Sequence, residues 1–160
     1  MPRHSEKTTQ IFVFDPGIAE RAPLDLDPFE RAFLTIARHF ISNFEEPSDQ
    51  CWMQAFLESE RVFPPPFGAT IAHAIAIILT CVRDHRQSAF SYFRVGDPLA
   101  DMAMTKEERY LILTLRGTRF QQKTMAQTNA LLLCEGDGSS ALLEAVARLC
   151  IITGDGKPEP

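Results

Sequence analysis

Residues 69–82 read ATIAHAIAIILTCV, an apolar run that only Thr70, His73 and Thr80 interrupt. A membrane-spanning helix needs about 20 apolar residues, so this run is too short to cross a bilayer. Its length and its four alanines favour a helix over a buried strand. A helix that is apolar on every side must be covered on every side, so we expect a buried central helix of a soluble domain at about 69–82.

The composition is that of one globular domain. The 160 residues are 45% hydrophobic and 23% charged, and they are enough to enclose one substantial core. The net charge of -5 keeps such a chain soluble and argues against nucleic-acid binding over the whole surface. We therefore expect an all-α, single compact domain of five to six helices.

Local signals place the helices around this run. Asp27 and Glu30 flank Pro28 as in a capping box, and Thr105 and Glu108 form a second box. Glu30 and Arg38 fall opposite the apolar positions of the first helix, so we expect both to face outward. The helices are predicted at about 28–44, 49–61, 68–87, 106–116, 118–134 and 140–152.

Three further features complete the predicted helices. Gly117 suits the C-terminal cap of the helix at about 106–116, and Phe120 is expected to point inward from the next helix. In the helix at about 49–61, one broad face carries apolar side chains. These are Trp52, Met53, Phe56 and Leu57.

Two aromatic segments, 10–14 and 89–95, are extended in character and end at turn residues. We expect them to form one short two-stranded pairing, within a chain or across a dimer, packed on the helices. The polar ends, 1–9 and 154–160, are expected to be disordered tails of a helical domain at 10–153. The first ten residues contain no apolar stretch, so we expect no secretory signal.

The four cysteines are widely spaced and form no CxxC pair. We expect free thiols in a reducing compartment, and hence a cytoplasmic protein with no membrane contact. Cys81 and His85 share one helix face and are the local candidates for a metal site, but a structural zinc needs four ligands. The same pair is the candidate for a thiol enzyme, and His73 is the candidate for a ligand pocket. A core histidine bonded to a neighbouring polar group is the favoured interpretation of His73.

The region 105–134 carries a local excess of basic residues. With Gly117 as its turn it could form a helix-turn-helix that binds DNA. Arg116 and Lys123 would then occupy positions that this motif fills with buried apolar groups, so a helical hairpin with a solvated face is favoured. The candidate nucleic-acid residues are Arg109, Arg116, Arg119 and Lys123.

No sequence motif in the chain specifies a catalytic mechanism or a cofactor. The favoured function is therefore a small cytoplasmic, non-enzymatic regulatory or adaptor-like protein that acts through protein–protein contacts, as a homodimer. The alternatives are a DNA-binding transcription regulator that uses 105–134, and a metal- or thiol-dependent enzyme that uses Cys81 and His85.

Overall fold

The computed structural model describes residues 11–14 and 25–154 and shows six α-helices, a short 3-10 turn and two short strands. The all-α prediction is confirmed. The predicted tails, apart from Gly154, and the predicted turn at 15–17 lie outside the described residues. The elements are β1 (Phe12–Phe14), α1 (Pro28–Glu45), η2 (Pro47–Asp49), α2 (Cys51–Val62), α3 (Phe67–His85), β2 (Phe90–Tyr92), α4 (Lys106–Arg119), α5 (Lys123–Cys134) and α6 (Ser139–Thr153).

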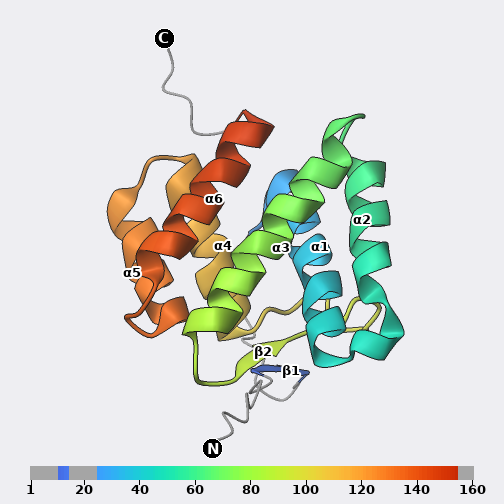
Figure 1. Cartoon of the computed structure of the whole chain (residues 1–160), viewed down its shortest axis with the longest axis horizontal. Helices are drawn as coiled ribbons and strands as arrows, with labels where there is room; N and C mark the ends of the chain where they lie inside the picture. The colour runs from blue at the N-terminus through green and yellow to red at the C-terminus, as the bar shows by residue number, and fades with distance from the viewer. Residues whose placement is uncertain (1–10, 15–24, 155–160) are drawn as a thin grey trace, which may run out of the picture.

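The helices form two layers, with α6, α3 and α2 in front of α5, α4 and α1 in Figure 1. The core lies between the layers, and α3 supplies Ile75, Ile78 and Leu79 to it, all with no exposed surface. Leu111 of α4 and Leu149 of α6 are equally buried in the same cluster. The apolar run at 69–82 therefore forms the middle helix of the front layer.

Both predicted capping boxes are present. The Asp27 carboxylate accepts from the Glu30 N–H at 2.8 Å, and the Asp27 N–H donates to the Glu30 carboxylate at 3.1 Å. Thr105 and Glu108 exchange the same two bonds at the start of α4. Each box satisfies helix N–H groups that have no partner within the helix, so these two helix starts were readable from the sequence.

The predicted β-pairing is confirmed and is parallel, with Phe12 opposite Phe90 and Phe14 opposite Tyr92. Glu45, the last residue of α1, holds the pair against the bundle. Its carboxylate accepts from the Phe14 N–H at 3.0 Å, the Tyr92 hydroxyl at 2.6 Å and the Arg94 guanidinium at 2.8 Å. Burial and the bond to Glu45 raise the pKa of Tyr92 to about 12, so this hydroxyl remains a donor at neutral pH.

The sequence predicted that Gly117 would cap α4, and this prediction is wrong. The helix continues to Arg119 and is capped by Phe120, and α5 begins at Lys123 rather than near 118. A Cβ on Gly117 would lie 2.6 Å from the backbone nitrogen of Ala126. The glycine is therefore needed where α5 crosses α4 closely. Because the turn follows Gly117 by three residues, Phe120 is 57% exposed instead of pointing inward.

Apolar side chains on α2 and α3 are more exposed than the sequence predicted. In α2 only Ala55 and Ser59 are buried, because this helix lies at the edge of the front layer. Trp52 and Leu57 are 46% and 52% exposed, and Met53 is similarly exposed. A stripe of α3 is also exposed, and it is described next.

Candidate protein-interaction surface

One side of α3 faces outward. We define the α3 face as Ala69, Thr70, His73 and Ile77, which are all exposed. Their spacing of three and four residues places them along one stripe of the helix. Ile77, an aliphatic side chain in the middle of an apolar helix, is 41% exposed. The α3 face therefore has two apolar and two polar side chains, and no other element among the described residues covers it.

The packing around α3 explains why this side is left uncovered. The helix contacts α2 on one side, α6 on the other and α1 beneath, which buries residues such as Ile71, Ile75 and Val82. With α2 and α6 beside it in the same layer, the side opposite α1 has no neighbour (Figure 1). The prediction of a helix covered on every side is corrected here.

The helices α2 and α3 approach each other closely at the elbow between them. The Ser59 hydroxyl donates to the Gly68 carbonyl oxygen at 2.6 Å, and a Cβ on Gly68 would lie 2.6 Å from the Glu60 Cα. Below the elbow the two helices diverge in Figure 1, so the start of α2 lies apart from the middle of α3. Trp52, in the first turn of α2, is 46% exposed and packs edge-on against Phe56 of the same helix, with ring centroids 6.3 Å apart.

By length and composition, α3 is the one helix among the described residues that could cross a membrane. Only 39% of its most apolar window is buried in the structure. The buried part nevertheless forms the centre of the helical core, with Ile75, Ile78 and Leu79 fully enclosed. Its packing between α2 and α6 is that of a core helix in a soluble protein, as the sequence had predicted.

His73 is exposed, so the interpretation as a hydrogen-bonded core histidine is wrong. It lies on the uncovered stripe with Ile77, four residues further along the helix. A signal of this arrangement is present in the sequence. The polar residues Thr70, His73, Thr80 and Asp84 recur at helical spacing, and they mark the side of α3 that faces solvent.

Cys81 and His85 lie together near the end of α3, as predicted, but each is engaged locally. The His85 Nδ1 atom is 2.8 Å from the Cys81 carbonyl oxygen and donates to it. The His85 ring packs against Gly138, where an added Cβ would come within 2.1 Å of it. The described residues contain no group of three or more His, Cys, Asp or Glu side chains able to hold a metal ion.

The Cys81 thiol is also poorly suited to nucleophilic chemistry. Burial raises its pKa above the ordinary value, and the nearby Asp84 carboxylate raises it further. A reactive cysteine needs the opposite, a lowered pKa that gives thiolate at neutral pH. All four cysteines are free, and Cys134 and Cys150 are buried, in agreement with the predicted free thiols.

The basic residues of 105–134 do not share one free face. Arg116 forms an ion pair with Glu30 at 2.8 Å, and Arg119 forms one with Asp27 at 2.7 Å. The Arg119 guanidinium also lies 4.5 Å from the centroid of the Phe29 ring. These two arginines therefore join the end of α4 to the start of α1, and their charges are neutralised there.

The other two nucleic-acid candidates differ from this pair. Lys123 is exposed at the start of α5, and Arg109 is half-buried in α4. The α4–α5 hairpin closes tightly at Gly117 and Ala126, which agrees with the favoured hairpin interpretation of this region.

We expect Arg116→Ala to lower the free energy of unfolding by about 1–2 kcal/mol, because it removes the charged partner of the buried Glu30. Lys123→Ala, at an exposed position, should change it by less than about 0.5 kcal/mol. Urea unfolding followed by circular dichroism measures both. Equal, negligible losses would show that the Arg116–Glu30 pair does not support the fold.

The sequence matches no family model, no curated protein and no solved structure.

Proposed function

We propose that this protein is a small cytoplasmic, non-enzymatic regulatory or adaptor-like protein that acts through protein–protein contacts and works as a homodimer. The observation that carries the proposal is the exposed apolar surface of the front layer, with Ile77 of α3 41% exposed and Trp52 and Leu57 of α2 46% and 52% exposed. Contiguous exposed apolar surface on a soluble protein marks an interaction site. Aromatic residues such as tryptophan are enriched where partners bind.

A hollow of about 590 Å³ lies beside α1, and its lining includes Arg38, Asp25 and Asp101. Arg38 is buried, and its guanidinium is already bonded to Glu108 and to the carbonyl oxygen of Ala100. The Arg38 charge therefore serves the fold. The proposal rests on the exposed apolar surface and not on this hollow.

The mass in solution tests the homodimer. Multi-angle light scattering at tens of micromolar should give twice the chain mass of 18.0 kDa. The mass should fall towards that of one chain on dilution if the subunits exchange. A single chain mass at high micromolar concentration would contradict the proposal.

A further inference from the structure

We propose that a hollow between α4, α5 and α6 binds a small apolar monocarboxylate, and that Lys123 pairs with the carboxylate of this ligand. The hollow has a volume of about 300 Å³, which is the lower end of the range for ligand sites in proteins. Its lining residues lie on α4, α5 and α6 and in the turn between α4 and α5. The inference goes beyond the proposed protein contacts of α2 and α3 and does not depend on them.

The close crossing of α4 and α5 forms the floor of the hollow. Gly117 has no side chain, and the Ala126 backbone lies so near that a Cβ on Gly117 would not fit. Ala126 itself has only a methyl group, so neither residue fills the space above the crossing. Leu143 of α6 is half-buried and adds an aliphatic wall. An apolar group can therefore enter the hollow and cover these surfaces.

The polar part of the lining offers groups that are free to bind a ligand. The Thr118 hydroxyl is already engaged, since it donates to the Thr114 carbonyl oxygen at 2.9 Å. Lys123 and Gln127, both exposed on α5, form no hydrogen bond or ion pair with any residue that the structure describes. These two side chains lie four residues apart, so they share one side of the helix.

The charge of the lining specifies the charge of the ligand. Lys123 is the one charged residue among the described residues that line the hollow. Its ammonium group offers three donors, and the Gln127 amide can donate as well. An anionic group that accepts hydrogen bonds therefore fits, and a cation is repelled. A bare inorganic anion would leave the apolar floor at Ala126 and Leu143 uncovered, so the ligand also needs an apolar part.

The larger hollow beside α1 does not select a ligand in this way. Arg31 lines it together with Asp25 and Asp101, so its free charges are of both signs. The hollow between α4, α5 and α6 combines an apolar floor with a single unpaired cation. That combination is the observation that carries the inference.

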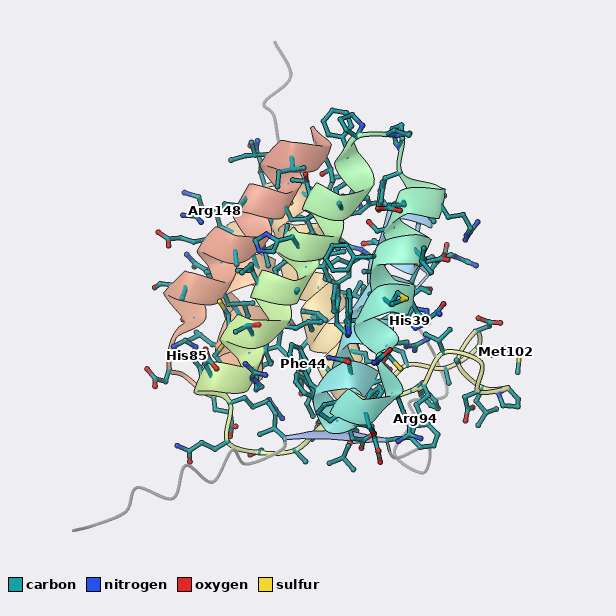
Figure 2. The ribbon with its side chains drawn as sticks, turned by 45° about the vertical axis from the view of Figure 1, so that its right-hand side comes forward. His39, Phe44, His85, Arg94, Met102 and Arg148 are labelled. Carbon is teal, nitrogen blue, oxygen red and sulfur yellow. The ribbon has the colours of Figure 1, made fainter. Side chains whose placement is uncertain are left out.

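Octanoate is the probe, and octylammonium, which has the same chain length and the opposite charge, is the matched ligand control. Titration of the ¹⁵N-labelled full chain should shift the amide signals of Gly117 and Ala126 to saturation, with a dissociation constant on the order of a millimolar. Octylammonium should bind at least roughly fivefold more weakly. The Met102 amide is the reference for non-specific binding. Met102 is 66% exposed and lies on the opposite side of the molecule from α5 and α6 in Figure 2.

Replacing Lys123 with methionine tests the charge pair. Lys123→Met keeps most of the aliphatic stem and removes the ammonium group, so the octanoate dissociation constant should rise roughly fivefold, as expected for a partly exposed charge pair. Lys106→Met is the matched control, because Lys106 is an exposed lysine at the first residue of α4, as Lys123 is at the first residue of α5. It should bind octanoate as the parent chain does.

Gln127→Glu tests the sign of the charge from the other side of the site. The substitution keeps the shape of the side chain and places a carboxylate in the lining, four residues from Lys123. It should weaken octanoate binding and strengthen octylammonium binding. Gln54→Glu makes the same change at an exposed position of α2, outside the hollow, and should alter neither. Circular dichroism of each variant establishes that the helices are retained.

Saturable shifts at Gly117 and Ala126 that Lys123→Met weakens and Lys106→Met preserves support the inference. It is overturned if millimolar octanoate gives no saturable shifts there, or shifts Met102 equally. It is also overturned if octylammonium binds as well as octanoate, or if both lysine variants behave alike. Light scattering of the parent chain decides the homodimer independently, so a failure of the proposed function and a failure of this site are distinguishable.

Discussion

Replacing Arg38 with methionine should lower the free energy of unfolding by about 3–5 kcal/mol, as expected when one partner of a buried ion pair is removed. The Arg38 and Glu108 side chains are only 6% and 0% exposed. The methionine retains most of the arginine stem, so the packing of α1 against α4 changes little. The Glu108 carboxylate is left buried without its counter-charge, and that is the main cost.

Arg38 also organises the segment that leads into α4. It donates to the Ala100 carbonyl oxygen at 2.8 Å and to that of Ala103 at 3.2 Å. Glu108 in turn accepts the Thr105 N–H that closes the capping box. Arg38→Met should therefore loosen 97–104 more than the rest of the chain, and amide hydrogen exchange would show this.

Urea unfolding measures the loss, and Arg61→Met is the matched control. Arg61 forms an equivalent pair with Glu58 at 2.6 Å, but its side chain is 71% exposed. Exposed pairs contribute little, so the control should lose less than about 1 kcal/mol. The double variant Arg38→Met with Glu108→Met should recover part of the loss, because no unpaired charge then remains. An Arg38→Met loss no larger than the control would contradict the assignment.

The Arg38–Glu108 pair is a long-range contact that could not be predicted from the sequence. The two capping boxes were predictable because their residues are three positions apart and interact whichever way the chain folds. Arg38 and Glu30 were expected to face outward, since they lie opposite the apolar stripe of α1. Periodicity identifies the polar side of a helix, but α4 and the segment before it cover that side. Partners separated by 70 residues cannot be read from a local pattern.

The α3 face is the opposite case, because an apolar side chain that the sequence predicts to be buried is exposed. An apolar run predicts burial, and one side of α3 is buried as expected, with Ile75 and Leu79 fully enclosed. Whether the remaining side of α3 is also buried depends on how many helices pack around it. The number of neighbouring helices follows from the tertiary fold and cannot be read from the sequence of α3. Ile77 is therefore a core residue by sequence and a surface residue in one chain.

The close crossing of α4 and α5 gives the second large expected effect. Gly117→Val should lower the free energy of unfolding by about 3 kcal/mol, since overpacking of a tight contact costs this much. The added Cβ would lie 2.6 Å from the Ala126 backbone nitrogen and 3.0 Å from the Ala126 Cα. Backbone atoms cannot move aside as a flexible side chain does, so the two helices must separate.

A graded series distinguishes this steric cost from helix propensity. Gly117→Ala adds only the Cβ and gains about 1 kcal/mol of helix propensity, so its net loss should be smaller than that of Gly117→Val. Leu131→Val is the control, because Leu131 is 47% exposed on α5 of the same hairpin. It introduces a β-branched residue without a clash and should cost less than about 1 kcal/mol. If Gly117→Ala instead stabilised the protein in urea unfolding, Gly117 would be a replaceable helical residue, and the hairpin would not depend on close backbone contact.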